Sequence, residues 1–290
     1  MKVLCLKRKK KWKAIGCVLL CSFFLLSGCR TEKPNETKKA ETEQRKEEQE
    51  EALIQEKREQ EEKEQAAKEA AEKECAEAIT LVIDPGHSGV VEERQEPVGP
   101  GAQEYKAGDT YGTSGISTGI PEYELTLDLA LQLKTELETR GYKIVMTRDT
   151  NEVPRSCLER ADIMNQAGAA ACLRIHANGS EDSSVQGAMT ICTTPQNPYV
   201  PQMYASSRML SDCVLDSLVE ATGCVSQGVW ETDTMSGNNW SQIPVTIVEV
   251  GYMTNPEEDV LLSQEDYRKK IVFGLADGLE EFIKKSQNEN

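Results

Sequence analysis

Short β-rich runs alternate with helical stretches over residues 79–285, and this alternation restricts the fold more than any other feature of the sequence. Five apolar runs predict strands: residues 79–84, 142–147, 169–175, 187–193 and 245–250. Four stretches predict helices: residues 122–140, 157–166, 204–221 and 267–285. Such an order is typical of an α/β domain, so we expect one domain with a mixed, largely parallel sheet flanked by helices on both faces.

Between the first predicted strand and the first predicted helix, residues 97–119 are rich in Gly, Pro, Ser and Thr and lack periodicity. This composition predicts a long loop, and a long loop inside a compact domain is usually functional or mobile. Whether residues 90–119 leave a site open or gate it as a lid stays open at this point.

The chain contains only two histidines. His87 follows the first predicted strand and His176 follows the strand predicted over residues 169–175. Open α/β sheets bind ligands at the carboxyl ends of their strands. A single histidine is more often structural than catalytic, but the matched placement of these two favours a shared functional site.

Zinc commonly binds histidine nitrogen and carboxylate oxygen, and a catalytic zinc site uses three protein ligands. Glu122 is the candidate carboxylate, because it starts a predicted helix directly after the long loop. Its alternative role is that of an ordinary first-turn acid that the helix dipole stabilises. We therefore predict one zinc ion held by His87, Glu122 and His176, although an N,O donor set also suits other divalent ions.

Glu249 interrupts an apolar strand predicted over residues 245–250. Burying an unpaired charge is costly, so such a residue is usually paired, ligated or catalytic. We predict that Glu249 is the general base that deprotonates the attacking water and then protonates the leaving amine. The alternative is a structural glutamate that pairs with an arginine.

Four motifs together resemble the zinc-dependent N-acetylmuramoyl-L-alanine amidases of the amidase-3 type: IDPGH at 83–87, GIPE at 119–122, RIHAN at 174–178 and VEVGYMTNP at 248–256. They occur in family order, and the resemblance covers residues 79–284. It implies hydrolysis of the amide between the lactyl group of N-acetylmuramic acid and the L-alanine of the peptidoglycan stem peptide.

The resemblance also implies residue roles. His87, Glu122 and His176 match the zinc ligands of that family, and Glu249 matches its catalytic glutamate. Asp84 and Asn178 match motif positions that shape the pocket.

Arg174 departs from the family pattern, which usually has serine at this position. Side chains alternate along a strand, so Arg174 is expected on the same side as His176. We consider two roles for it, binding of an anionic substrate group or pairing with Glu249.

The first 28 residues predict a secretory signal, with a basic run at 7–13 and an apolar run at 14–26 that is short for a membrane span. Residues 26–29 (LSGC) resemble the lipobox of bacterial lipoproteins, which implies a lipid anchor on Cys29. An uncleaved signal anchor is the alternative, and it too places the remaining chain outside the cytoplasmic membrane.

Glu, Lys, Gln and Ala dominate residues 36–77, where there is no proline or glycine. Apolar residues are too sparse there for a coiled-coil seam, so we interpret 29–77 as a solitary charged helical stalk, with disorder as the alternative. Residues 78–286 are then the zinc amidase catalytic domain.

Charge and cysteine content narrow the partners and the compartment. A net charge of -16 argues against nucleic-acid binding, because that needs a basic face. The expected partners are peptidoglycan and the membrane through the lipid anchor, at an extracytoplasmic location facing the cell wall; no regulatory protein is identified.

Six cysteines follow Cys29, an even number that permits disulfides: Cys75, Cys157, Cys172, Cys192, Cys213 and Cys224. Buried free thiols are the alternative for Cys172 and Cys192.

Three other functions remain to be weighed. Residues 115–119 (GISTG) satisfy the G-x-S-x-G pattern of serine hydrolases, but that motif needs a strand directly before the serine, and a loop is expected here. A different zinc peptidase acting on peptidoglycan would use the same residue types. A catalytically inactive wall-binding lipoprotein is the third alternative.

Overall fold

The computed structural model describes residues 53, 55–61, 63, 65 and 78–288. The chain divides into two units, residues 1–65 and 66–290. The described residues of the first unit are helical. The predicted signal, Cys29 and the rest of the predicted stalk lie outside the described residues. No helix in the described part of the chain combines the length and apolar character that crossing a membrane requires.

A six-stranded sheet forms the centre of the second unit, in the order β4-β1-β5-β8-β6-β7. Its strands are β1 Thr80–Pro85, β4 Lys143–Met146, β5 Ala171–Asn178, β6 Ala188–Cys192, β7 Ser226–Glu231 and β8 Val245–Tyr252. All neighbouring pairs are parallel except β6 and β8, which are antiparallel. The prediction of a mixed, largely parallel sheet is confirmed.

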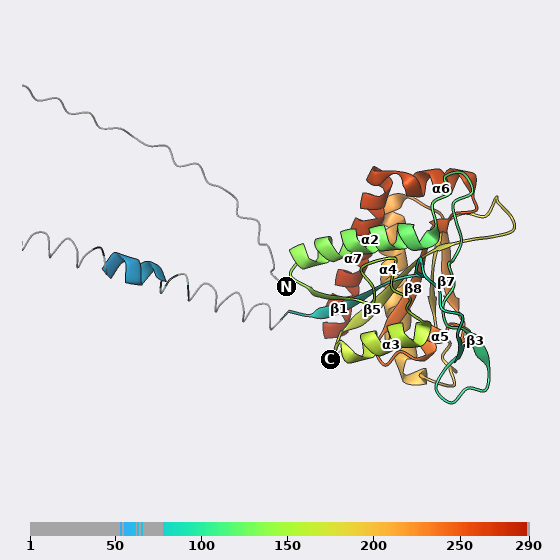
Figure 1. Cartoon of the computed structure of the whole chain (residues 1–290), viewed down its shortest axis with the longest axis horizontal. Coiled ribbons are helices and arrows are strands. Elements are labelled where there is room, and N and C mark those ends of the chain that lie inside the picture. The colour runs from blue at the N-terminus through green and yellow to red at the C-terminus, as the bar shows by residue number, and fades with distance from the viewer. Residues whose placement is uncertain (1–52, 54, 62, 64, 66–77, 289–290) are drawn as a thin grey trace, which may run out of the picture. The chain divides into compact units, whose positions relative to one another are not determined.

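Helices cover both faces of this sheet, because successive strand side chains point to opposite faces. Leu81 and Ile83 of β1 pack into a core formed with α2 (Glu122–Thr139), α4 (Tyr204–Thr222) and α7 (Glu265–Asn288). Val82 points the other way, into a second core with α3 (Cys157–Gln166) beside α5 (Ser236–Asn239). Figure 1 shows α2 and α3 on opposite sides of the strands.

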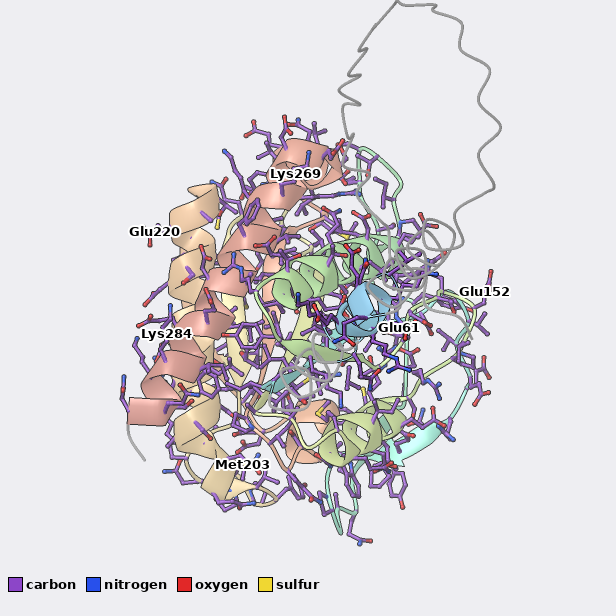
Figure 2. The ribbon with its side chains drawn as sticks, turned by 90° about the vertical axis from the view of Figure 1, so that its left-hand side faces the viewer. Glu61, Glu152, Met203, Glu220, Lys269 and Lys284 are labelled. Atoms are coloured by element: carbon purple, nitrogen blue, oxygen red, sulfur yellow. The ribbon has the colours of Figure 1, made fainter. Side chains whose placement is uncertain are left out.

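Helices α4 and α7 lie side by side, as Figure 2 shows, with Glu220 and Lys269 toward the upper end and Met203 at the lower end. The amphipathic pattern of α7 explains this docking, because its Leu275 and Leu279 are fully buried. Burying a leucine contributes roughly 1.5–3 kcal/mol, so this face fixes the closing helix on the domain.

Several elements were not predicted. Residues 97–119 were expected to be loop, but a two-stranded antiparallel hairpin of β2 (Gln95–Pro97) and β3 (Tyr105–Ala107) overlaps them. Tertiary contacts hold this hairpin: the indole N–H of Trp240 donates to the Pro97 carbonyl at 3.0 Å. Three further short elements were also missed: β7, α5 and α6 (Pro256–Ser263). Strand β7 lies at the edge of the sheet, so its sequence lacks the apolar pattern of the central strands.

The five cysteines of the described domain are free thiols: Cys157, Cys172, Cys192, Cys213 and Cys224. The alternative of buried free thiols is therefore correct for Cys172 and Cys192, while Cys75 lies outside the described residues. Burial raises the pKa of the Cys172 thiol well above its usual range and that of Cys192 to about 11. Neither thiol has the thiolate character that reactive cysteines need.

Candidate active site

Three neighbouring strands bring the predicted site residues to one edge of the sheet. His87 follows β1 directly, His176 lies near the end of β5, and Glu249 lies in β8. In the sheet, β5 stands between β1 and β8, and His176 pairs in register with Glu249. Helix α2 begins with Glu122 and adds a carboxylate from outside the sheet.

The two histidines and Glu122 converge on one point. The Glu122 Oε1 atom lies 3.0 Å from Nδ1 of His176 and 3.2 Å from Nε2 of His87. The imidazole rings are 4.8 Å apart between centroids and nearly perpendicular. One ligand atom from each residue lies within 4.8 Å of the others, which is a grouping that can hold a metal ion. Tertiary structure thus assembles the three predicted ligands.

Hydrogen bonds orient these side chains. The Thr110 carbonyl lies 2.8 Å from Nδ1 of His87. Since a carbonyl only accepts, this contact places a proton on Nδ1 of His87. Against the effect of burial, the Glu122 carboxylate beside Nε2 raises the pKa of this imidazole. The Glu122 carboxylate accepts from the backbone N–H groups of Thr113 at 2.9 Å and Ala177 at 3.2 Å. Partners of this kind fix the orientation of metal ligands.

Two glycines permit the close packing of the site. A Cβ atom on Gly86 would lie 2.4 Å from Cε1 of His176, so only glycine lets this imidazole approach the turn after β1. A Cβ atom on Gly112 would lie 2.4 Å from Oε2 of Glu122, and Gly112 also has a left-handed φ of 75°. Neither glycine stands out in the sequence, because the side chains that approach it are remote in the chain.

Electrostatics within the group favour an ionised Glu122. Burial alone would raise its pKa, but hydrogen bonds and charge from His176 and His87 hold it well below its usual range. Burial lowers the pKa of His176 despite the hydrogen bond to Glu122, so this imidazole is neutral at neutral pH. A neutral imidazole and an ionised carboxylate are the forms that bind metal ions.

Glu249 has the opposite environment. Burial, with a smaller contribution from the Glu122 charge, raises its pKa to about 8, against an opposing effect of Arg174. Its Oε2 atom is buried and has no hydrogen-bond partner, and neither has Nε2 of His176. Buried polar atoms are normally paired, so unpartnered atoms in one site indicate a place where a ligand is bound.

The raised pKa of Glu249 predicts a pH dependence of stability in the metal-free protein. The ordinary value is 4.5 and the folded value about 8, so the folded state keeps a proton that the unfolded chain releases in that window. The contribution of Glu249 to the free energy of unfolding is therefore fully present below pH 4.5, and it is lost as pH rises through about 8. Urea denaturation of metal-free wild type and Glu249→Gln at several pH values will measure this. We expect the wild type to lose stability more steeply, and parallel curves would contradict the assignment.

Arg174 does not pair with Glu249, which corrects one of the two roles considered for it. Its Nε donates to the Asp84 carboxylate at 2.8 Å, and Arg160 donates to the other oxygen at the same distance. Asp84 is fully buried, so this carboxylate supports the strand ends rather than the pocket surface. Arg174 lines a small pocket of about 90 Å³ together with His87 and His176.

Asn178 stands at the end of β5 beside this group. Its Oδ1 accepts from the Gly179 N–H at 2.8 Å, which shapes the turn after the strand. No contact to a candidate ligand is made by its side chain among the described hydrogen bonds.

The Asp84 network predicts a large effect on stability. The two arginines outweigh burial and hold the pKa of Asp84 well below its usual range. The contribution of Asp84 to the free energy of unfolding is present above the pKa of its carboxyl in the unfolded chain. It is lost only as pH falls through the pKa of that carboxyl in the folded protein. Asp84→Asn leaves buried guanidinium charge uncompensated, which we expect to cost about 3–5 kcal/mol. Denaturant unfolding at neutral pH measures this, with Asp277→Asn, which breaks an exposed pair with Arg140, as the control. Equal losses in both variants would refute the role.

The segment between His87 and Glu122 is tied to the domain at several points. The buried Glu96 accepts from the Leu158 N–H at the start of α3, at 3.1 Å. Farther along, the amides of Ser117 and Thr118 donate to Asp259 at 2.7 and 2.8 Å. Asp259 is a residue that the sequence reading missed.

The same contacts remove the basis for a serine hydrolase. Ser117 lies in a turn, and its Oγ contacts the Pro256 carbonyl rather than a histidine. Both histidines of the chain instead contact Glu122.

The α/β domain presents His87, Glu122 and His176, a group that can hold a metal ion, beside Glu249 at one edge of its sheet. A family described as N-acetylmuramoyl-L-alanine amidase (Amidase_3) matches residues 81–281. The chain belongs to this family of enzymes, as its motifs predicted.

Known relatives agree with this assignment. The chain is 26% identical over 211 residues to N-acetylmuramoyl-L-alanine amidase Rv3717 of Mycobacterium tuberculosis, covering 71% of this chain and 86% of that protein. It is 28% identical over 199 residues to amidase LytC of Bacillus subtilis, covering 69% of this chain but only 34% of LytC. The crystal structure of the amidase Ami1 from Mycobacterium smegmatis superposes with a TM-score of 0.65 at 26% identity, covering 71% of this chain and 97% of Ami1.

Proposed function

We propose that this protein hydrolyses the amide between N-acetylmuramic acid and L-alanine in peptidoglycan, with one zinc ion held by His87, Glu122 and His176. The observation that carries the proposal is the convergence of these three side chains beside the unpartnered Glu249, within a domain of the amidase family. Family membership supports this bond over other amides of the wall, since the residue types alone suit any zinc peptidase.

The donor set fits zinc. Two imidazoles and one carboxylate are a known combination for catalytic zinc, and they leave a coordination position open. Zinc bound there would supply Lewis-acid chemistry, which polarises a carbonyl group and lowers the pKa of water. The ionised Glu122 and the neutral His176 are already in the protonation states that this role requires.

Glu249 supplies the proton transfer. Its carboxylate takes a proton from the water whose oxygen bonds to the lactyl carbonyl carbon, and it then gives that proton to the nitrogen of L-alanine as the C–N bond breaks. The products are the lactyl carboxylate and a stem peptide with a free amine. A pKa near neutral pH suits a group that must both accept and donate.

Asp84, Arg174 and Asn178, the other predicted site residues, support the pocket in this proposal. Asp84 holds Arg174 and Arg160 at the base of the site. Arg174 lines the pocket beside both histidines, which supports a role in binding an anionic substrate group. Asn178 shapes the turn that borders the site.

We also propose that Cys29 carries a lipid anchor and that residues 29–77 link it to the catalytic domain, so that the enzyme acts outside the membrane on the cell wall. The lipobox-like sequence at residues 26–29 supports this anchor. Metabolic labelling with a fatty acid will test it: wild type should be labelled, and Cys29→Ala should not. Equal labelling of the two proteins would contradict the anchor.

Digestion of purified peptidoglycan followed by mass spectrometry tests the proposed bond. The expected products are stem peptides with a free L-alanine amine and glycan strands with intact lactyl groups. Peptides cut at another amide would indicate a different zinc peptidase, and an unaltered wall would indicate a binding module. Chelation should stop cleavage, and added zinc should restore it.

A further inference from the structure

His87 has an unusual backbone conformation. Its φ of 59° is in the left-handed region, and among the described residues it is the one non-glycine residue with a positive φ. Side chains rarely adopt this region because Cβ approaches the carbonyl oxygen, so surrounding contacts must hold it. The strain lies at a predicted metal ligand.

Two buried arginines bind the carbonyl groups around this residue. Arg160 donates to the Pro85 carbonyl at 2.6 Å and to the His87 carbonyl at 2.7 Å. Arg148 donates to the Pro85 carbonyl at 3.1 Å and to the Gly86 carbonyl at 2.8 Å. Three consecutive carbonyls of the turn at 85–87 are therefore held by guanidinium groups.

The same contacts reach the helix that carries Glu122. Arg148 also donates to the Tyr123 carbonyl at 2.9 Å, in the first turn of α2. Thr126, in that helix too, donates its hydroxyl to the Gly86 carbonyl at 2.8 Å. The hydrogen bonds thus connect the backbone of one predicted ligand to the helix start of another.

Both arginines are nearly inaccessible to solvent. Arg148 is 4% exposed and Arg160 2% exposed. Burial and the neighbouring Arg160 lower the pKa of Arg148 to about 10, which leaves it protonated at neutral pH. Arg160 borders the small pocket that His87 and His176 also line, so its effect on the predicted ligands is best measured by zinc affinity and by unfolding, which need no substrate.

We propose that Arg148 and Arg160 are positioning residues, which hold the strained turn at 85–87 so that His87 and Glu122 have their metal-binding geometry before the metal arrives. The expected effect on zinc binding rests on the proposed function, but the restraint of the turn is a property of the metal-free chain. Arginine suits the task because its planar guanidinium binds several acceptors at fixed angles, which a lysine ammonium does not.

Zinc affinity is the first readout. Competition with a chromogenic chelator should show that folded Arg160→Lys binds zinc about 10–100-fold more weakly than wild type, as losing a partner that orients a ligand does. Arg268→Lys is the matched control, because Arg268 also donates to a backbone carbonyl, that of Leu262 at 2.6 Å, but its described partners, Leu262 and Asp128, are not predicted ligands. Wild-type affinity in Arg160→Lys would overturn the proposal. If Arg160→Lys does not fold, Thr126→Val, which removes one bond to Gly86, takes its place with a smaller expected loss.

A double-mutant cycle on the metal-free protein is the second readout. Glycine adopts a positive φ without strain, so His87→Gly should relieve the strain of the turn. The gain in stability should be larger in the wild-type background, where Arg160 enforces the conformation, than in the Arg160→Lys background, where the turn can relax. Non-additive unfolding midpoints are expected, and additive ones would overturn the proposal. This cycle involves no zinc, so it tests the restraint separately from the proposed function. If the proposed function were wrong, the wild-type protein would bind no zinc in the first experiment.

Discussion

Replacing Glu249 by glutamine should lower kcat for peptidoglycan cleavage by about 10²–10⁴-fold, the usual contribution of a general acid–base group. Glutamine has almost the same shape as glutamate but cannot exchange the proton. The three proposed metal ligands are unchanged in this variant, so bound zinc should remain at the wild-type level. Release of free amines from purified wall, together with metal analysis of the same samples, measures both quantities.

Glu258→Gln is the matched control for this prediction. Glu258 is also buried, and burial likewise raises its pKa. Its carboxylate accepts from the Tyr252 N–H at 2.8 Å and the Gly187 N–H at 2.9 Å, outside the candidate site. We expect the folded Glu258→Gln protein to cleave peptidoglycan with a kcat close to that of wild type. If Glu249→Gln cleaved as well as the control, Glu249 would not be the base.

Glu122→Gln should weaken zinc binding about 100-fold and lower activity at limiting zinc. The amide is a far weaker ligand than the carboxylate that lies between His87 and His176. Structural zinc sites bind with roughly 10–16 kcal/mol shared among four ligands, so losing one ligand costs about 3 kcal/mol, or ~100-fold in affinity. Chelator competition measures the affinity, and wall digestion at limiting zinc measures the loss of activity.

Glu124→Gln provides the control in the same helical turn. Glu124 carries the same charge near the same helix N-terminus, but it is exposed. If Glu122 acted only as a first-turn acid that favours the helix dipole, the two variants would behave alike. A difference confined to Glu122 identifies it as a ligand, whereas equal zinc affinity in both variants would refute that role.

Much of the site was predictable because its chemistry is local in sequence. His87 and His176 directly follow apolar runs, and parallel strands place such positions at one edge of a sheet. Glu249 was recognisable because a charge inside an apolar strand needs a partner or a function. Glu122 needed the family resemblance, because a glutamate at a helix start is ordinary without it.

The partner of Arg174 was not predictable. Strand alternation placed Arg174 on the side of His176, which allowed pairing with Glu249, but the structure pairs it with Asp84. Those two residues are 90 positions apart and become neighbours only because β1 and β5 are adjacent, with Asp84 opposite Arg174 in register. The hairpin of β2 and β3 was missed for a similar reason, since its support comes from Trp240, which is remote in sequence.

The sequence by itself determined the α/β alternation, the family and the four residues proposed for catalysis, because hydrophobic period and residue chemistry are properties of short segments. Only the tertiary structure decided how these residues are held: the left-handed turn at His87, the arginines that bind its carbonyls and the unpartnered oxygen of Glu249. Burial and hydrogen-bond partners depend on segments that meet only after folding, and these set the pKa of Glu249 and the geometry around Glu122.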